Sequence, residues 1–269
     1  MVGKHIRVLV GLDIGTTKVS AVVGELAGEG NLEVIGLGCR SYKGVHKGVI
    51  VDIDGTADVI AAVLEDAQVM AGVRIDAVYA GLSGAQVESL SSEGSIELAT
   101  KEVTPRDIQQ VIKTIRSQAP VHDREILHVI PQEFILDGQK GLTKPVGMTG
   151  AKLEVRALVI TVATPTLQTF RSVIDLGRIG VREVVAQPLA SAEAVLTEDE
   201  KGLGVALIEM GGATTDIAIY SGGTLQHLSS VIVGGNHVTN DLAIGLRTPV
   251  AEAERLKKQY GCALLSMVH

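Results

Sequence analysis

The chain has 269 residues, enough for one large domain or two smaller ones with a well-buried core. Hydrophobic residues make up 46% of it and charged residues 20%, which is typical of a folded globular protein and excludes an intrinsically disordered one. The formal net charge of −7 argues against nucleic acid as a partner. Because there is no Trp and only two Phe, the core must consist mainly of aliphatic side chains, which favours an α/β sheet.

The two cysteines, Cys39 and Cys262, have no spacing that suggests a metal site or a disulfide framework, so a reducing compartment is expected. No signal-peptide pattern is present, and the longest apolar run, Ala157–Ala163, is far too short to cross a bilayer. We therefore expect a cytoplasmic protein.

A phosphate-binding hairpin is predicted near the start of the chain. The segment Leu12–Lys18 lies between two strand signals, Ile6–Gly11 and Val19–Val23. A glycine-rich turn brings backbone N–H groups close to an anion, and threonine hydroxyls add donors. The segment is neither a P-loop nor a Rossmann fingerprint. The residues predicted to bind phosphate or, for the first, Mg²⁺ through water are Asp13, Gly15, Thr16, Thr17 and Lys18. Asp13 could instead stabilise the turn, and Lys18 could be a solvated lysine.

A strand at Glu33–Gly38 and a helix at Asp54–Ala71 are predicted next, with Asp54 or Thr56 as the N-cap of the helix. A short strand, Ala77–Leu82, ends the first stretch of α/β character.

From Gly84 the pattern becomes mixed and predicts an inserted α+β subdomain over residues 84–165. Its predicted elements are strands at Gln86–Leu90 and Ser95–Leu98, a helix at Thr104–Ser117 that opens with a cap and a proline, and strands at His128–Phe134 and Leu153–Ala163. Helix and strand then alternate again: a helix at Pro165–Leu176, a strand at Val181–Val185, a helix at Pro188–Leu196 and a polar loop at Thr197–Gly202.

A second hairpin of the same kind follows about two hundred residues after the first. Glu209–Asp216 lies between the strand signals Val205–Ile208 and Ile217–Tyr220, which indicates an internal duplication. Two such hairpins that face each other could clamp a polyphosphate. The residues expected at phosphate are Gly211, Gly212, Ala213, Thr214 and Thr215, and those expected at the metal through water are Glu209 and Asp216.

The last predicted elements are a strand at Val231–Val233, a helix around His237–Gly245 and a helix at Val250–Tyr260. Glu254 and Lys257 share one face of the final helix, where an ordinary surface pair is the simplest interpretation.

Both hairpins and the junction helix between them resemble the ATPase domain shared by actin, hexokinase and the heat-shock chaperones. Further stretches are similar to the bacterial actin-like cell-division family FtsA: Leu127–Glu133, Pro145–Met148, Val195–Glu200 and Gly261–Leu264. The resemblance runs through the whole chain. It implies an actin-like ATPase fold with duplicated, ribonuclease-H-like domains. Residues 1–83 with 166–196 would form the first domain, 84–165 the inserted subdomain, 197–235 the start of the second domain and 236–269 part of its small subdomain.

The resemblance also implies a function. Family members bind ATP with Mg²⁺, assemble into filaments, and link the FtsZ ring to the cytoplasmic face of the cell membrane and, through the inserted subdomain, to later division proteins. By this likeness the chain would be a scaffold with at most weak ATPase activity, Gln187 would orient the attacking water, and Glu254 and Lys257 would contact adenosine. Gln187 could equally be a polar residue at the start of a helix.

Two features set the chain apart from the family pattern. Glu209 stands where the family has Asp, and Ala213 where it has Gly, which would affect the metal geometry and a turn that needs positive φ. Nucleotide binding can survive both changes, and efficient hydrolysis is the property that they put in question. We also expect the chain to be a shortened form, with an incomplete second domain and without the C-terminal amphipathic helix that attaches the family to the membrane.

Two other functions fit the same fold. A small-molecule kinase would need a carboxylate base between the domains, and no isolated Asp in the linker obviously serves. A pilus-assembly actin relative would not be expected to carry the Pro131-Gln132-Glu133 stretch.

Overall fold

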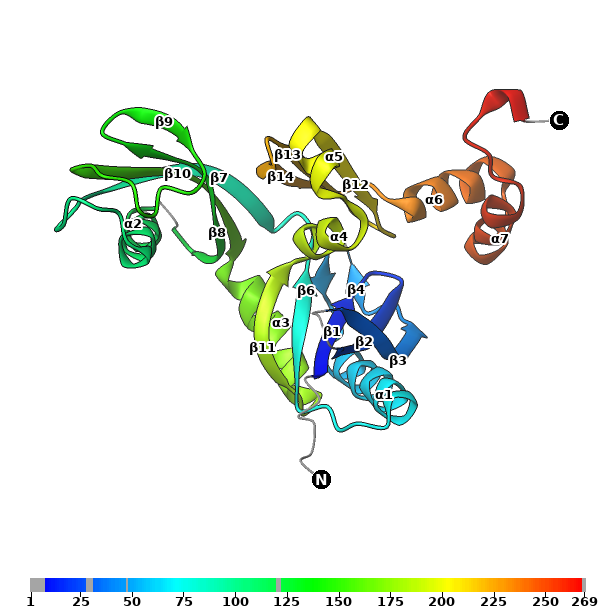
Figure 1. Cartoon of the computed structure of the whole chain (residues 1–269). Helices are drawn as coiled ribbons and strands as arrows, with labels where there is room; N and C mark the ends of the chain where they lie inside the picture. Colours follow the sequence, from blue (N-terminus) through cyan, green and yellow to red (C-terminus); the bar gives the residue numbers. More distant parts are fainter. Residues whose placement is uncertain (1–7, 28–30, 47, 120–121, 268–269) are drawn as a thin grey trace.

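The computed structural model describes residues 8–27, 31–46, 48–119 and 122–267. Of the strand predicted from Ile6, the residues before Val8 lie outside this range. The described chain forms three main sheets with helices around them (Figure 1).

The first sheet has five strands in the order β11-β6-β1-β2-β3. Strands β1, β2 and β3 form an antiparallel meander, whereas β6 and β11 run parallel to β1. The strands span Val8–Ile14 (β1), Lys18–Leu26 (β2), Leu32–Ser41 (β3), Ala77–Leu82 (β6) and Gly180–Ala186 (β11). Helices α1 (Ile53–Ala71) and α3 (Thr164–Leu176) pack on this sheet and against each other.

The buried residues and the N-cap of helix α1 explain why this stretch is helical. Ile60, Val63 and Leu64 are buried against the sheet, as the 3.6-residue period predicts. The helix begins at Ile53, one residue before its predicted start, and its N-cap is neither Asp54 nor Thr56 but Asp52, whose side chain accepts a hydrogen bond from the Gly55 N–H at 3.0 Å.

The inserted stretch forms a separate antiparallel sheet, β7-β10-β8-β9, covered by helix α2 (Pro105–Gln118). Its strands are β7 (Val87–Glu97), β8 (Arg124–Leu136), β9 (Gln139–Leu142) and β10 (Lys152–Ala163). The sheet has its own core, in which Phe134, Leu153 and Val155 pack near Val111 and Ile115 of α2. Thr104 caps α2, as predicted.

The two strands predicted at Gln86–Leu90 and Ser95–Leu98 are in fact the single strand β7. Gly94 lies within this strand and does not interrupt it. A glycine is required at this position because α2 packs closely on the strand. A Cβ at Gly94 would lie 2.5 Å from the Thr114 hydroxyl oxygen and 3.0 Å from the Val111 carbonyl oxygen.

The third sheet is an antiparallel meander of β12 (Val205–Met210), β13 (Thr215–Ser221) and β14 (Thr224–Val231). The strand predicted at Val231–Val233 is therefore placed too late. The hairpin between β13 and β14 turns at Gly222 and Gly223, both with positive φ (61° and 78°), and this glycine pair was the sequence signal for it.

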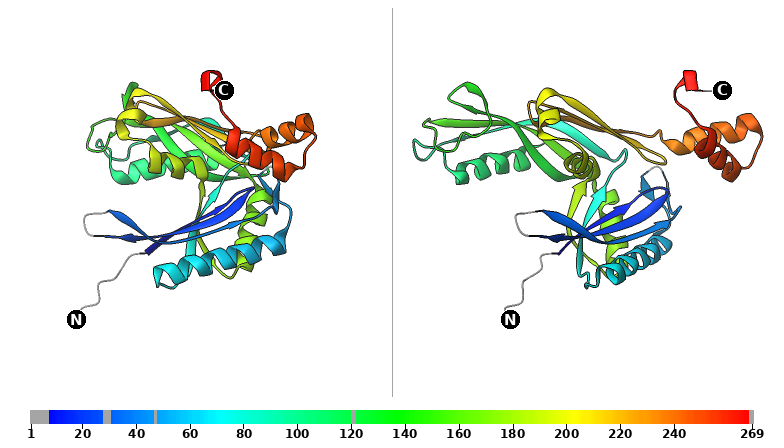
Figure 2. Two further views of the ribbon diagram at one scale, coloured as in Figure 1. Left: turned by 90° about the vertical axis from the view of Figure 1, so that its right-hand side faces the viewer. Right: turned by 45° about the vertical axis from the view of Figure 1, so that its right-hand side comes forward.

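Four helices accompany this sheet: α4 (Gln187–Val195), α5 (Glu198–Leu203), α6 (Gly235–Leu246) and α7 (Val250–Tyr260). Helices α6 and α7 lie at the opposite end of the molecule from the inserted subdomain (Figure 2). No helix in the described part of the chain is long and apolar enough to span a membrane.

The polar stretch Thr197–Gly202, predicted to be a loop, instead contains helix α5. Thr197 and Glu200 form a reciprocal capping box at its start. Of the acidic residues in the first turn of α5, Glu198 pairs with Lys201 at 2.9 Å. Lys201 is only 4% exposed and also pairs with Glu193 of α4 at 2.9 Å.

The inserted subdomain contacts β14 through side chains. The Ser89 hydroxyl donates to the Leu228 carbonyl at 2.7 Å and accepts from the Leu228 N–H at 3.2 Å. Gln132 donates from Nε2 to the Leu225 carbonyl at 3.0 Å. Because β14 is an edge strand, these bonds satisfy backbone groups that lack a neighbouring strand.

The packing of β3 on α1 predicts a large effect of one methyl group. A Cβ at Gly38 would overlap the Val63 carbonyl oxygen, so Gly38→Ala must push the helix from the sheet. We expect the free energy of unfolding to fall by about 3 kcal/mol or more. Gly11→Ala in the same sheet is the control: nothing lies within 4 Å of its added Cβ, and the change should stay within about 0.5 kcal/mol. Urea denaturation followed by circular dichroism measures both, and equal effects would contradict the packing described here.

Candidate functional site

A cavity of about 250 Å³ lies between the two predicted hairpins. The end of β6 and the short strands β4 (Val45–His46) and β5 (Val49–Ile50) complete its wall. The lining residues are Asp13, Ile14, Gly15, Thr16, Thr17, Lys18, Val45, Gly48, Ile50, Gly81, Leu82, Ser83, Phe170, Gln187, Glu209, Met210, Gly211, Gly212, Thr214 and Asp216.

The two hairpins have the same local geometry. The Gly15 N–H donates to the Lys18 carbonyl at 2.9 Å, and the Gly211 N–H donates to the Thr214 carbonyl at 2.8 Å. The strand pairing has the same register in both hairpins: Asp13 lies opposite Ser20 in the first, and Glu209 lies opposite Asp216 in the second. These equivalent turns are what an internal duplication produces.

Ala213 does not strain the second turn. Among the described residues, positive φ outside glycine occurs only at Asp123, Asp137, Arg178 and Arg247. The expected conflict between a Cβ at position 213 and a left-handed backbone therefore does not arise.

The hairpins touch each other at Gly212. A Cβ at this position would lie 2.5 Å from the Thr17 methyl group and 3.6 Å from the Thr16 Cβ. Only glycine allows the two turns to approach this closely.

Two carboxylates at the cavity, Asp13 and Asp216, are buried in a way that disfavours their ionised form. The Asp13 Oδ1 is fully covered and has no hydrogen-bond partner, and burial, followed by the negative charge of Glu209, raises the pKa of Asp13 against the opposing effect of Lys18. Asp216 is 5% exposed and accepts a 3.4 Å bond from the Gly84 N–H; burial is the main cause that raises its pKa, and Glu209 adds to it. Negative charges held in this way fit a cation.

The chemistry of these donors fits Mg²⁺ held partly through water. Mg²⁺ keeps several waters and usually takes one or two carboxylates together with phosphate oxygens. Asp13 and Asp216 provide two such carboxylates. Among the residues that the structure describes, no group of three or more His, Cys, Asp or Glu side chains is arranged to hold a metal by itself.

Glu209, predicted as a third metal residue, lines the cavity and is hydrogen-bonded to α4, and its contact with a metal stays a prediction. Its Oε1 accepts from Gln187 Nε2 at 2.5 Å and its Oε2 accepts from the Ser191 hydroxyl at 2.8 Å. Gln187 and Ser191 are four residues apart and so lie on one face of the helix. Gln187 lines the cavity as predicted, with its amide nitrogen turned to Glu209.

Two predicted phosphate residues do not line the cavity. Ala213 is buried, and the Thr215 hydroxyl donates to the Val233 carbonyl at 2.6 Å. Their backbone positions hold the turn, whereas the side chains face away from the cavity.

Glu254 and Lys257 also lie outside the cavity wall. They pair with each other at 2.7 Å, and Lys257 Nζ donates to the Gly235 carbonyl at 3.0 Å and to the Thr239 hydroxyl at 2.7 Å. Hydrogen bonds from Lys257 and Thr239 lower the pKa of Glu254 to about 2. The pair therefore ties α7 to the start of α6, directly behind the second hairpin, and its contact with adenosine stays a prediction.

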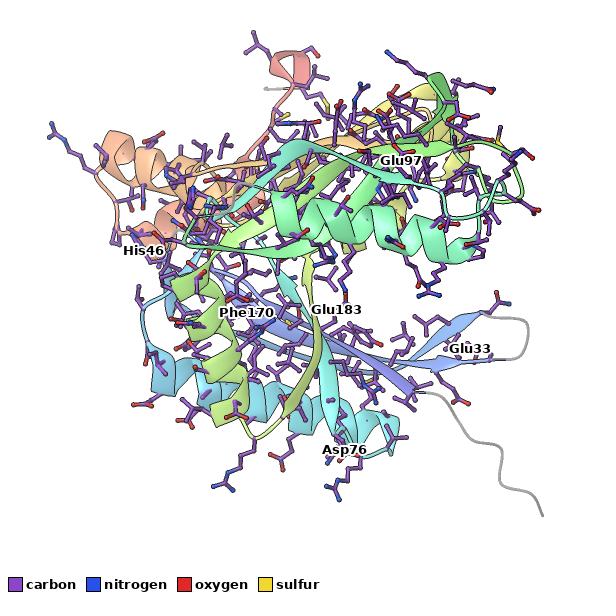
Figure 3. All side chains as sticks on the ribbon, turned by 90° about the vertical axis from the view of Figure 1, so that its left-hand side faces the viewer. Glu33, His46, Asp76, Glu97, Phe170 and Glu183 are labelled. Carbon is purple, nitrogen blue, oxygen red and sulfur yellow. The ribbon has the colours of Figure 1, made fainter. Side chains whose placement is uncertain are left out.

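Sequence reasoning missed the wall made by Gly81, Leu82 and Ser83, and by Phe170 on α3, which Figure 3 labels. The signal for the first three was available, because the carboxyl ends of neighbouring parallel strands form ligand sites and β6 pairs with β1.

Two equivalent hairpins line one cavity between a five-stranded sheet and the three-stranded sheet, which is the arrangement of an actin-like fold. A solved PilM-PilN type IV pilus biogenesis complex has the same fold, with a TM-score of 0.69, 15% identity, and coverage of 94% of this chain and 70% of that one. At this identity the likeness shows the fold alone.

The family is narrower than the fold. The family model of the SHS2 domain inserted in FtsA matches residues 84–161, and that of cell division protein FtsA matches residues 206–269. The cell division protein FtsA of Pseudomonas aeruginosa is 41% identical over 97% of this chain, and that of Neisseria meningitidis is 40% identical over 94%. The chain belongs to the FtsA family. It spans 63% and 61% of the lengths of these two relatives.

The buried carboxylate of Asp13 predicts a stability gain on its removal. Because the pKa of Asp13 is raised above its ordinary value, the ionised group destabilises the fold as pH rises through its folded-state pKa. Without nucleotide or Mg²⁺ at pH 7, Asp13→Asn should raise Tm by about 2–4 °C, the shift expected for about 1 kcal/mol in a protein of this size. The gain should shrink toward pH 4. The exposed Asp58→Asn is the control, and an equal gain there would contradict the assignment.

Proposed function

We propose that the cavity binds ATP with Mg²⁺ and that the chain acts in cell division as an actin-like scaffold. The observation that carries the proposal is the convergence of two equivalent hairpins on one cavity that holds two buried, energetically unfavourable carboxylates. A bound cation and its phosphate ligands would remove that cost.

Each part of the cavity has a role in this proposal. The hydroxyls of Thr16, Thr17 and Thr214, with the ammonium group of Lys18, bind phosphate oxygens. Asp13 and Asp216 hold Mg²⁺ through water, and the ion neutralises phosphate charge.

Hydrolysis would depend on Gln187. Its amide nitrogen is bound to Glu209, which leaves the carbonyl oxygen to accept a hydrogen bond from a water beside the terminal phosphate. Glu209, which stands where the family has Asp, accepts hydrogen bonds from α4 on both oxygens and is less available to the metal, so we expect at most weak ATPase activity. Nucleotide binding would then regulate assembly more than turnover.

The finer roles follow from the family. We propose that the protein self-assembles into filaments, contacts FtsZ and, through the inserted subdomain, binds later division proteins at the cytoplasmic face of the membrane. Family membership and the matched inserted domain support this proposal. Membrane attachment would require a C-terminal amphipathic helix, which the family has beyond the length matched here.

Nucleotide binding can be tested with variants that keep the shape of the first hairpin. Thr16→Val together with Thr17→Val removes both hydroxyls but retains the methyl group that packs on Gly212. Affinity for ATP–Mg²⁺ in titration calorimetry should fall at least about tenfold, since hydrogen bonds to charged groups contribute about 1.5–3 kcal/mol each. Thr100→Val, exposed on the inserted subdomain, should leave it unchanged.

Tripolyphosphate–Mg²⁺ provides a second probe of the same cavity. Because every cavity residue that the proposal assigns binds phosphate or Mg²⁺, tripolyphosphate should compete with ATP at similar concentration. Equal ATP affinity in wild type and the double variant would show that the hairpin is not the phosphate site.

A further inference from the structure

One side chain of the inserted subdomain reaches the place where the first sheet passes into α4. His128 lies on β8, opposite Ile160 of β10, and its Nε2 accepts the Ala186 N–H at 3.0 Å. Ala186 is the last residue of β11 and the N-cap position of α4.

This position needs a partner from outside. β11 is an edge strand with β6 as its one neighbour in the sheet, so backbone groups on its other side have no ladder partner. The next residue is Gln187, whose side chain enters the cavity and binds Glu209. His128 therefore holds the backbone one residue before a predicted site residue.

The hydrogen bond requires a neutral imidazole. Nε2 can accept only if the ring proton is on Nδ1, and the imidazolium ion has no acceptor. The charged groups that face the ring are Glu183 on β11, labelled in Figure 3, and Arg116 on α2; nearby on α3, Arg171 pairs with Glu125 at 3.6 Å. Burial lowers the pKa of His128, Arg116 acts in the same direction and Glu183 opposes them.

We propose that His128 is a positioning residue of the nucleotide cavity: by holding the Ala186 N–H, it fixes the point at which Gln187 leaves the first sheet. Through this bond the inserted subdomain sets the geometry of a cavity that none of its own strands lines. The nucleotide part of the inference rests on the proposed function, whereas the hydrogen bond and its effect on α4 do not.

The bond makes the α4 junction sensitive to acid. Because the folded-state pKa of His128 lies below its ordinary value, the neutral ring stabilises the fold above that ordinary value. This stabilisation is lost as pH falls through the folded-state pKa, when Nε2 becomes a donor that faces the Ala186 N–H.

Hydrogen exchange of the Ala186 amide without nucleotide tests the bond directly. In wild type, its protection relative to the intrinsic exchange rate should be about tenfold higher at pH 7.5 than at a lower pH chosen below the folded-state pKa of His128, which a titration of its ring-proton NMR signals locates. His128→Gln places an uncharged acceptor at a similar reach, so protection should persist at both pH values. His128→Leu should show low protection at both. The Val185 amide, one residue earlier and therefore turned toward β6, is the reference and should not change.

The outcomes separate the alternatives. The proposal is wrong if protection of Ala186 in wild type does not change as His128 titrates, or if His128→Gln loses protection at the lower pH as wild type does. If His128→Leu does not fold, wild type and His128→Gln still decide the question.

Titrations of ATP–Mg²⁺ at the two pH values test the effect on the cavity. Affinity should fall about fivefold more from pH 7.5 to the lower pH in wild type than in His128→Gln. Equal losses would limit His128 to a structural role and overturn its assignment as a positioning residue. Absence of ATP binding in every variant would instead overturn the proposed function, and the exchange data would still test the link to α4.

Discussion

The strand β10 is the constraint on which the rest of the structure depends, because both of its faces are buried. Leu158, Ile160 and Val162 pack in the main core, whereas Val155, Ala157 and Val159 pack in the core of the inserted subdomain. Full burial of one such aliphatic side chain contributes about 1.5–3 kcal/mol, so the strand cannot shift its register without large loss. Its paired neighbours β7 and β8 are thereby fixed against the actin-like domains, and β8 places His128 and Gln132 at two different elements beyond its own sheet.

The cavity combines two closely packed turns with two buried carboxylates whose ionised form destabilises the fold. Two turns of the same geometry meet at Gly212, and neither uses a left-handed residue, so their shape is maintained by the strands that flank them. Between these turns the structure holds Asp13 and Asp216 at the expense of stability. Such an arrangement is expected where a ligand, and not the fold, satisfies the charged groups. Glu209 differs from both because α4 supplies two donors to it.

The parts of the structure that sequence predicted are those specified by short local patterns. Both hairpins, helix α2 with its Thr104 cap and the change of character at Gly84 depend on neighbouring residues, and the internal repeat indicated that the hairpins belong together. The capping box of α5 and the Gly222-Gly223 turn were also local, and the sequence analysis overlooked them. The bond between Glu209 and Gln187 and that between His128 and Ala186 join residues 22 and 58 positions apart. No periodicity or motif encodes such pairs, because they depend on how three sheets are assembled.

The contact between Ser89 and Leu228 has a consequence for motion. A backbone ladder between β7 and β14 would have joined two sheets into one, and their separation would then require many hydrogen bonds to break in concert. Here Ser89 and Gln132 make the polar bonds of the junction, and Leu225 and Leu228 of β14 are buried in the core that also holds Val87 and Leu158. Water can replace such bonds one at a time, but separation of the sheets would expose the buried leucines of β14. Motion of the third sheet against the inserted subdomain is therefore favoured as a slide that keeps these side chains covered while every strand pair remains intact. Collective shear motions of this kind occur on the microsecond to millisecond timescale.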